Sequence, residues 1–478
     1  MLPHPLGVQP LGNQLLFGTA TPCRRAGGLG DLALLSDEML LLLLQHLSPT
    51  SLATLGCASK ACYAFCASEE LWKSATLEAW GGDVRFTHSW RATYRAQCGL
   101  PGAPDAPPAR VSCAGVYSDL LFAPHRCAHV PLAPHWLGGD DVPRVCGLSV
   151  AAFERLYQTP NQPVIITDAV PSWPAATRWL PDALLAEHGQ LPVHAGGFTF
   201  ALRDYLQYAD ACGGPETAED VPLYVFDSAC LLQGPLAQDF QPPSYFAPDR
   251  DFFSLLAADG HPGGRPNHCW LILGPERSGS AWHVDPNATS AWNAVVCGSK
   301  KWILWPPGSP PPGVVASPDG AHVAQPSSLV DWYLNFYDAL EHGAARGRGS
   351  KRHVECTLRP GELLFVPSRW WHCVLNCGPG VTVAVTQNVC NTGNLGAVLR
   401  HLEGGNPDLV SGLAEEHRAS LGARLVACLE EHQPEALVRA RGGGEEVGRS
   451  AGVGQASAGS AKARFAADDS ARTFAFNF

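Results

Sequence analysis

The stretch Arg277-Ser-Gly-Ser-Ala-Trp-His283-Val-Asp285-Pro decides the interpretation, because a strand-like segment ends there on a histidine and an aspartate. Of the 18 histidines in the chain, only His283 begins a His-x-Asp pattern. Side chains at positions i and i+2 of a strand point to the same face, so His283 and Asp285 can converge on one cation. A surface strand with two polar side chains would give the same pattern, so a metal site needs support from a second motif, a companion to the first.

The companion is Gly361-Glu-Leu-Leu-Phe-Val-Pro-Ser-Arg-Trp-Trp-His372, in which an apolar strand leads to a histidine 87 residues after Asp285. Two imidazoles and one carboxylate form the facial triad of non-haem iron(II) oxygenases, which leaves coordination positions open for a bidentate cosubstrate and O₂. We therefore predict that His283, Asp285 and His372 bind one metal ion. Zinc or manganese accepts the same ligands, so the residues leave the identity of the metal open.

Two adjacent lysines follow the first motif, although the whole chain contains only six. A 2-oxo dicarboxylate on the metal would extend its far carboxylate away from the ion, where one buried cation can hold it through charge-assisted hydrogen bonds. We assign this role to Lys300, and alternation along the strand should then turn Lys301 outward. Two surface lysines in a hairpin are the alternative. The other candidates for this pocket are Tyr224, Ser280, Asn293 and Thr386.

Short apolar runs separated by Gly and Pro recur between residues 142 and 392. They are Pro163–Thr167, Leu223–Phe226, Cys269–Leu273, Ala294–Val296, Trp302–Trp305, Val354–Leu358, Leu363–Val366 and Val381–Thr386. Many short strands with turn residues between them predict a sandwich or a jelly roll. The Pro-rich residues 306–330 predict an inserted loop, and 339–353 predict another.

Helical patterns flank the strand-rich region on both sides. Ser36 can cap a helix whose first turn carries Asp37 and Glu38, acids that favour a helix N-terminus. After Asn391, apolar residues again recur at helical spacing. An apolar face that stays partly exposed marks an interaction site. Candidates for such a face near the N-terminus are Met39, Leu42, Leu43 and Leu47.

These patterns divide the chain into six segments. They are a flexible arm (1–28), a helical module (29–80), a connecting region (81–141) with a Pro/Ala-rich linker at 100–111, a strand-rich domain (142–392), C-terminal helices (393–440) and a disordered tail (441–478). The linker predicts a domain boundary, so we expect a chain that begins near Val142 to fold by itself. Helices that flank an antiparallel strand domain predict the α+β class.

The composition excludes several classes of protein. A net charge of −11 argues against general affinity for nucleic acid. The 17 cysteines contain no Cys-x-x-Cys pair, which argues against a structural zinc module and for reduced thiols in the nucleus or cytoplasm. The longest apolar run, Met39–Leu44, is too short to cross a bilayer. Arg24 and Arg25 leave a transit peptide open as an alternative to a Pro-rich arm.

Six motifs in order closely resemble the JmjC family of Fe(II)/2-oxoglutarate oxygenases, in its arginine demethylase/lysyl-hydroxylase (phosphatidylserine-receptor-like) branch. They are PxxIIT at Pro163, PLYVFDS at Pro222, GPxRSG at Gly274, HVDPxxTSAWNAVVxGxKKW at His283, RPGExxFVPxxWWH at Arg359 and AVTQN at Ala384. The resemblance implies a double-stranded β-helix of the cupin type over residues 142–392. It also implies Fe(II) on His283, Asp285 and His372, and 2-oxoglutarate on Lys300 with Tyr224, Asn293 and Thr386. Ser280 stands where relatives often have Thr.

The helical module resembles an F-box, through Leu35-Ser-Asp-Glu-Met-Leu-Leu, Leu47-Ser-Pro-Thr-Ser-Leu, Cys57-Ala-Ser-Lys-Ala-Cys-Tyr and Glu70-Leu-Trp. The resemblance implies binding to a Skp-type adaptor of a cullin-RING ubiquitin ligase. An ordinary helical subdomain packed on the oxygenase is the alternative.

Together the resemblances predict an iron(II)- and 2-oxoglutarate-dependent dioxygenase. It would use O₂ to hydroxylate a protein Lys or Arg side chain or to demethylate N-methyl-Arg or N-methyl-Lys. A histone or another nuclear protein is a possible substrate, whereas nucleic acid and membrane are not implied. The chain lacks the Lys-rich stretches and serine-rich tail of its relatives, which weakens any transfer of nuclear targeting. The alternatives are a non-catalytic F-box substrate receptor with a JmjC binding domain and a small-molecule hydroxylase.

Overall fold

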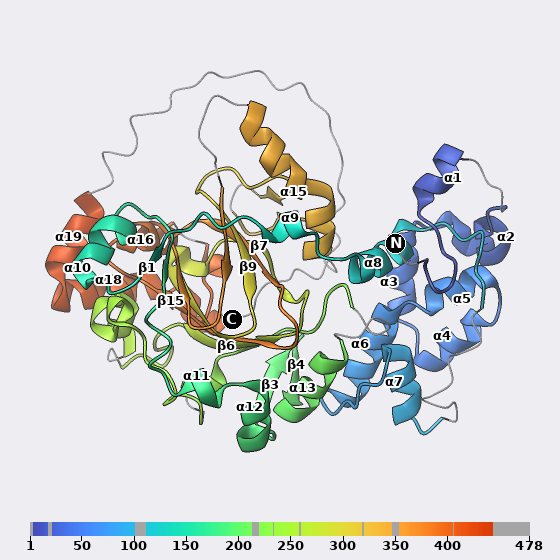
Figure 1. The fold of residues 1–478 in the computed structure, drawn as a ribbon, viewed down its shortest axis with the longest axis horizontal. Coiled ribbons are helices and arrows are strands. Elements are labelled where there is room, and N and C mark those ends of the chain that lie inside the picture. Colours follow the sequence, from blue (N-terminus) through green and yellow to red (C-terminus); the bar gives the residue numbers. More distant parts are fainter. Residues whose placement is uncertain are drawn as a thin grey trace.

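The computed structural model describes residues 3–17, 22–100, 111–212, 219–232, 234–257, 260–317, 320–346, 353–404 and 406–442. Most of the tail predicted for 441–478 and most of the linker at 100–111 lie outside these residues. Within them, a strand-rich body carries helices at both ends of the sequence (Figure 1).

Two sheets form the body. The larger has nine strands among the described residues, in the order β1 (Arg144–Val145), β2 (Val164–Ile166), β13 (Leu363–Val366), β8 (Ser290–Cys297), β15 (Thr382–Val389), β6 (Cys269–Gly274), β5 (Val225–Asp227), β3 (Pro192–Ala195) and β4 (Phe198–Ala201). The smaller has four there, β12 (Val354–Leu358), β9 (Lys300–Trp305), β14 (Trp371–Asn376) and β7 (Gly279–His283). All strand pairs are antiparallel except β1 with β2.

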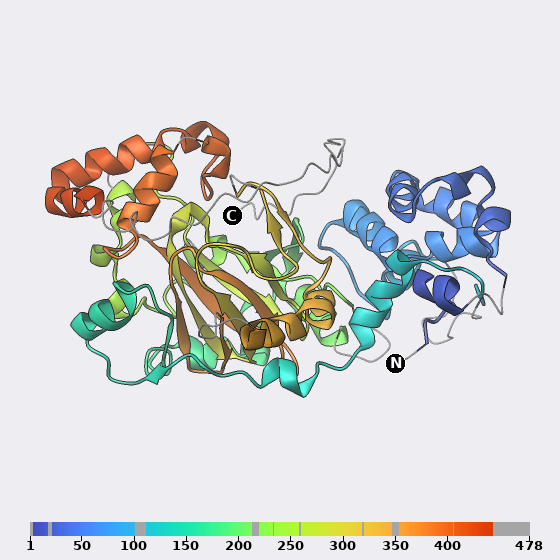
Figure 2. The same ribbon diagram turned by 90° about the horizontal axis from the view of Figure 1, so that it is seen from above.

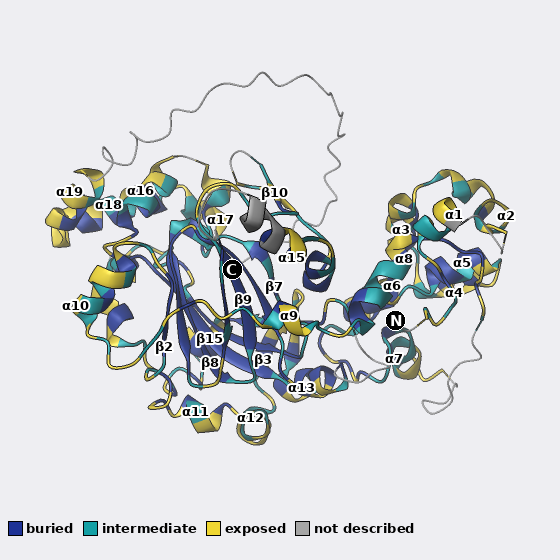
Figure 3. Cartoon of the chain, turned by 45° about the horizontal axis from the view of Figure 1, so that its top comes forward, coloured by how far each residue is buried: buried dark blue, intermediate teal, exposed yellow. Residues whose placement is uncertain are grey.

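Strand alternation separates an interior between the two sheets from their outer faces. The buried interior residues come from strands of both sheets, for example Ile272 on β6, Val295 on β8 and Val374 on β14. Their neighbours along the strands, such as Leu271 and Cys373, belong to clusters on the outer faces. The central strands, such as β6, β8, β13, β14 and β15, are almost entirely buried (Figure 3). This two-sheet jelly roll in an α+β chain is the fold predicted from the sequence.

The N-terminal helices are α1 (Leu11–Phe17), α2 (Arg25–Leu29), α3 (Asp37–Gln45), α4 (Pro49–Gly56), α5 (Lys60–Cys66) and α6 (Glu69–Trp80). As predicted, Ser36 caps α3 by accepting a hydrogen bond from the Met39 amide. Leu40 and Leu44 of α3 are buried, whereas Met39 is 51% and Leu43 44% exposed. The expected exposed face therefore exists. Leu42 shares it, and Leu47 is only half-buried.

The arm predicted for residues 1–28 is not uniformly irregular. Besides α1 and α2, Val8 is 2% exposed, and Gln9 forms a parallel bridge with Tyr117. Residues 111–142, here called the strap, then carry α8 (Asp119–His129) and α9 (Pro134–Leu137) from the N-terminal helices along the smaller sheet (Figure 2).

The sequence led us to expect that a chain beginning near Val142 folds by itself, but residues before Val142 make many contacts with the body. Helix α7 (Trp90–Gln97) and the residues before it pack on α13 (Leu202–Ala211), with Phe86 and Tyr208 ring centroids 5.2 Å apart. The Arg277 guanidinium donates to the Cys127 and Val130 carbonyls of the strap at 2.8 and 2.6 Å. One hydrophobic cluster joins the N-terminal helices to the larger sheet. The Pro/Ala-rich segment therefore does not mark a boundary without contacts, because the residues on its two sides pack together.

Further helices cover the body. Residues 306–330 contain the short hairpin β10 (Val315–Ala316) and β11 (Val323–Ala324), and helix α15 (Leu329–Arg346) replaces part of the loops expected at 306–330 and 339–353. Helices α10 (Val150–Phe153), α11 (Ala175–Arg178), α12 (Pro181–His188) and α14 (Ala229–Leu232) lie in the body. The C-terminal helices are α16 (Leu395–Glu403), α17 (Glu415–Arg418), α18 (Leu421–His432) and α19 (Pro434–Gly442). No helix within the described ranges has both the length and the apolar character needed to cross a membrane.

Candidate metal centre

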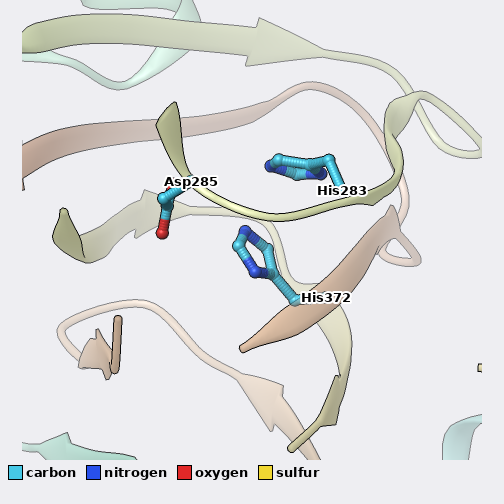
Figure 4. A group of neighbouring side chains, drawn as sticks. All are labelled: His283, Asp285 and His372. Carbon is cyan, nitrogen blue, oxygen red and sulfur yellow. The ribbon is translucent and has the colours of Figure 1, made fainter. Parts of the chain in front are cut away.

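Three donor side chains meet at one end of the smaller sheet. His283 ends β7, Asp285 follows two residues later, and His372 lies on β14 directly opposite His283 in the antiparallel register. The imidazole centroids are 4.2 Å apart, and one donor atom from each of the three residues lies within 4.8 Å of the others. Figure 4 shows the three side chains converging on a common point. Among the described residues this is the single group of its kind.

An irregularity in β7 sets this geometry. His372 pairs with His283, but Val374 pairs with Ser280, so β7 carries one extra residue between the two pairs. Ser280 and His283 therefore both lie opposite interior residues, although they are an odd number apart. Next to this irregularity, Gly279 lets β7 lie close to β14, because a Cβ there would lie 1.9 Å from the Val374 carbonyl oxygen.

The donor atoms suit a cation. The Nδ1 atoms of His283 and His372 donate to the Ala281 and Trp370 carbonyls at 2.7 and 3.0 Å, which orients each Nε2 lone pair toward the centre. Burial lowers the pKa of both imidazoles to about 4, so they stay neutral, as metal ligation requires. Burial raises the pKa of Asp285 to about 6, and its Oδ2 is buried without a hydrogen-bond partner in the described part. A bound cation would supply the missing partner.

Lys300 and Tyr224 meet inside the same barrel. The Lys300 Nζ donates to the Tyr224 hydroxyl at 2.9 Å, and Lys300 is 1% exposed. Burial lowers the pKa of Lys300 to about 7. The Tyr224 ring lies against Gly274, where a Cβ would approach it to 2.5 Å. An ammonium buried beside one hydroxyl is well placed to receive a carboxylate.

Asn293 and Thr386 are cross-strand neighbours on β8 and β15. The Thr386 hydroxyl donates to the Trp292 carbonyl at 2.9 Å, while the buried Asn293 Oδ1 has no hydrogen-bond partner in the described part. Both residues lie on the same strand face as interior apolar residues two positions away, Asn293 with Ala291 and Val295, and Thr386 with Ala384. All the pocket residues proposed from the sequence therefore line one interior, with Ser280 placed there by the irregularity in β7.

Lys301 lies on the opposite face of β9, as alternation predicts, but it is not at the surface. Its relative exposure is 0%, and its Nζ lies 2.7 Å from Glu355 Oε2 and 2.8 Å from the Gly139 carbonyl of the strap. The hydroxyl of Tyr337 on α15 donates to the same Glu355 carboxylate at 3.1 Å. The alternative of two surface lysines is therefore wrong, because the strap and α15 cover this face.

Two interior residues escaped the sequence interpretation. The Trp302 ring lies 5.7 Å from that of His372, and its buried Nε1 has no hydrogen-bond partner among the described residues. A hydrogen bond from the Asn388 side chain to the Asp285 carboxylate opposes the rise in the pKa of Asp285. Their even spacing from Lys300 and Thr386 on the same strands is the signal that could have identified them.

Comparisons with known proteins agree with this architecture. Residues 150–388 match the model of the family described as a cupin-like domain, and residues 32–74 match that of the F-box domain. The first match contains the three donors and all the pocket candidates, and the second contains α3 to α5.

Curated relatives extend the likeness along the chain. The arginine-specific demethylase JMJ22 of Arabidopsis thaliana is 38% identical, over 93% of this chain and 84% of its own length. The bifunctional arginine demethylase and lysyl-hydroxylase psr-1 of Caenorhabditis elegans is 33% identical, over 62% of this chain and 70% of its own. The human 2-oxoglutarate and iron-dependent oxygenase JMJD4 is 28% identical, over 53% of this chain and 62% of its own length. The chain belongs to the cupin-like JmjC oxygenase family, with an F-box domain ahead of the cupin-like domain.

Proposed function

We propose that the chain is an iron(II)- and 2-oxoglutarate-dependent dioxygenase that acts on a Lys or Arg side chain of a protein. The observation that carries this proposal is a single interior that holds two neutral imidazoles, an unsatisfied carboxylate oxygen and a buried lysine. Iron bound there would supply the chemistry that couples decarboxylation of 2-oxoglutarate to succinate and CO₂ with transfer of one oxygen atom from O₂ to a C–H bond.

The chain's own residues would divide the remaining work. His283, Asp285 and His372 bind the metal, with the histidines oriented by their Nδ1 hydrogen bonds. The Lys300 ammonium pairs with the distal carboxylate of 2-oxoglutarate, and the hydroxyls of Tyr224 and Thr386, with Asn293 and Ser280, complete its polar wall. The apolar interior around them limits access of water to the reacting groups.

The substrate class follows from the relatives, whose names describe arginine demethylation and lysyl hydroxylation. We extend that class to this chain, either as hydroxylation of a Lys or Arg carbon or as hydroxylation and loss of an N-methyl group. The reaction would take place in the nucleus or cytoplasm, with a histone or another nuclear protein as a possible substrate.

Succinate release tests this function. Purified protein with iron(II) and ascorbate should convert 2-oxoglutarate to succinate, and histone or splicing-factor peptides should stimulate the conversion when they fit the site. Mass spectrometry of the peptide distinguishes a gain of oxygen from a loss of methyl. Tight 2-oxoglutarate binding without turnover on any peptide would favour the non-catalytic receptor, and turnover on a free metabolite would favour the small-molecule hydroxylase.

A second function, recruitment of a cullin-RING ubiquitin ligase, is favoured by the exposed apolar side chains of α3. Met39 and Leu43 are half exposed there although neighbouring Leu40 and Leu44 are buried. We propose that this face binds a Skp-type adaptor. A pull-down with the adaptor should retain the wild-type chain and lose the variant Met39→Glu with Leu43→Glu. Equal retention of both would contradict the assignment, and the two functions can coexist.

A further inference from the structure

The backbone that leads into Tyr224 is held from outside the barrel. Glu219 accepts hydrogen bonds from Lys73 Nζ at 2.7 Å and from Trp90 Nε1 at 2.9 Å, and the same Lys73 ammonium donates to the Val221 carbonyl at 2.9 Å. Lys73 lies on α6, beside α13 in Figure 1, and within the residues that match the F-box domain. One side chain of the F-box domain thus contacts two residues that shortly precede Tyr224 in the chain, Glu219 and Val221.

This contact is buried and specific. Lys73 is 9% exposed, and the side chains of Lys73 and Glu219 are only 11% and 13% exposed. Burial by itself would lower the pKa of Lys73, but the neighbouring acidic groups, chiefly Glu219 and then Glu70, together outweigh burial and raise that pKa. A buried ion pair gains little stability over apolar packing, yet it fixes the relative position of its partners. The main effect expected of the Lys73–Glu219 pair is therefore to hold residues 219–221 in place against α6.

A second set of contacts acts on the same segment. The Leu223 amide donates to the Tyr208 hydroxyl at 2.8 Å, and the Leu223 carbonyl accepts from the Tyr205 hydroxyl at 2.9 Å. The Tyr208 ring packs edge-on against Phe86 and tilted against Trp90, with centroids 5.2 and 5.6 Å apart. Both attachments therefore connect residues 219–223 to the helical region that precedes residue 100.

The next residue is Tyr224 itself. Its hydroxyl accepts from Lys300 Nζ at 2.9 Å, and its ring has little freedom because it packs against Gly274. Only three peptide bonds separate Val221 from Tyr224, and a close-packed interior absorbs little displacement, so a shift of the backbone at Val221 should reach this ring.

We propose that Lys73 of the F-box domain is a positioning residue for the 2-oxoglutarate pocket. By holding Glu219 and the Val221 carbonyl, it sets the place of Tyr224 and, through it, of the Lys300 ammonium. The inference rests on the proposed function, because it concerns the affinity of that same pocket for its cosubstrate. It makes the F-box domain part of the oxygenase site as well as an adaptor surface.

The test measures the dissociation constant of 2-oxoglutarate by calorimetry on the full chain, with manganese(II) in place of iron, together with the thermal midpoint. Lys73→Met should weaken 2-oxoglutarate binding by about 3- to 30-fold, the range typical of coupled positions. Lys73→Arg, which keeps the charge, should restore part of the affinity. The matched control is Lys60→Met, because Lys60 is an exposed lysine of the same domain and should bind as wild type. Glu219→Gln carries the same expectation as Lys73→Met and replaces it if that variant does not fold.

A lowered thermal midpoint with an unchanged dissociation constant would overturn the proposal, because Lys73 would then serve stability only. Lys300→Ala separates this failure from a failure of the proposed function. If Lys300→Ala weakens binding and Lys73→Met does not, only the positioning role is lost. If the wild-type chain does not bind 2-oxoglutarate, or Lys300→Ala binds it equally well, both proposals fail.

Discussion

Asp285 is the one carboxylate of the three donors, and its Oδ2 is buried without a protein partner in the described part. Asp285→Ala should therefore abolish metal binding at this centre and, with it, turnover of 2-oxoglutarate. Manganese(II) binding followed by electron paramagnetic resonance checks the first result and succinate release the second. Turnover that survives Asp285→Ala would remove the triad from the mechanism.

Among the described residues, Lys300 is the only lysine in the interior, where its Nζ donates to the Tyr224 hydroxyl. Lys300→Ala should raise the KM for 2-oxoglutarate by about a hundredfold or more, because an uncompensated charge in a buried site costs several kcal/mol. Lys60→Ala is the control, since Lys301 is itself buried against Glu355 and its loss would disturb the fold. An unchanged KM in Lys300→Ala would place the cosubstrate elsewhere.

The protonation of Lys300 adds a pH dependence. Burial lowers its pKa to about 7, and only the ammonium form attracts a carboxylate. Affinity for 2-oxoglutarate should therefore be full below that pH and fall as the pH rises above it, by up to about tenfold per unit. Lys300→Arg should flatten this profile, because a guanidinium stays charged. Calorimetric titrations across pH 6 to 9 would contradict the assignment if both profiles fell in parallel.

At the scale of elements, β7 depends on a residue with no side chain. A Cβ at Gly279 would lie 1.9 Å from the Val374 carbonyl oxygen, and the glycine has a φ of +151°. Gly279→Ala should push β7 away from β14 and separate His283 from His372. The dissociation constant for manganese(II) should therefore rise strongly, while the thermal midpoint falls only moderately. The matched substitution is Gly260→Ala, where a Cβ would meet open space although φ is also positive. Equal metal affinity in both variants would show that β7 tolerates the shift.

The sequence predicted the strands whose residues carry a local signal, whereas β1, β3, β4 and β14 were not among the predicted runs. The runs Val354–Leu358 and Leu363–Val366 coincide with β12 and β13, since β-branched and aromatic residues alternate or cluster there between Gly and Pro. Helix α15 was missed because Pro-rich residues precede it, although Val330, Tyr333 and Tyr337 recur at helical spacing.

Part of the site could be predicted from the sequence in the same way. The three donors and Lys300 follow from motifs and strand alternation. The extra residue in β7, the cover over Lys301 and the pair Lys73–Glu219 were not predictable, because each depends on partners brought together by the fold. Glu219 lies 146 residues after Lys73, and a single sequence carries no signal for that pairing.

At the scale of the whole molecule, the strap makes truncation hazardous. A chain that begins at Val142 lacks Gly139, which binds Lys301, and Trp136, which belongs to the cluster outside the smaller sheet. It should be insoluble or melt far below the full chain, as circular dichroism would record. A chain that begins at Val111 keeps the strap and should yield more folded protein. Comparable solubility and melting of both would show that the strap adds nothing to the body.

The strap also dictates an order of events during synthesis on the ribosome. The Asp141 amide bonds to the Glu355 carbonyl at 2.6 Å, and Arg277 donates to carbonyls of residues made about 150 positions earlier. The first helices can form as they emerge, whereas the strap and the Lys73 ammonium must wait for partners translated much later. Contacts of such sequence separation slow folding and leave apolar surface open meanwhile. A nascent chain of this protein is therefore a natural client for chaperones until the last strands of the jelly roll have left the exit tunnel.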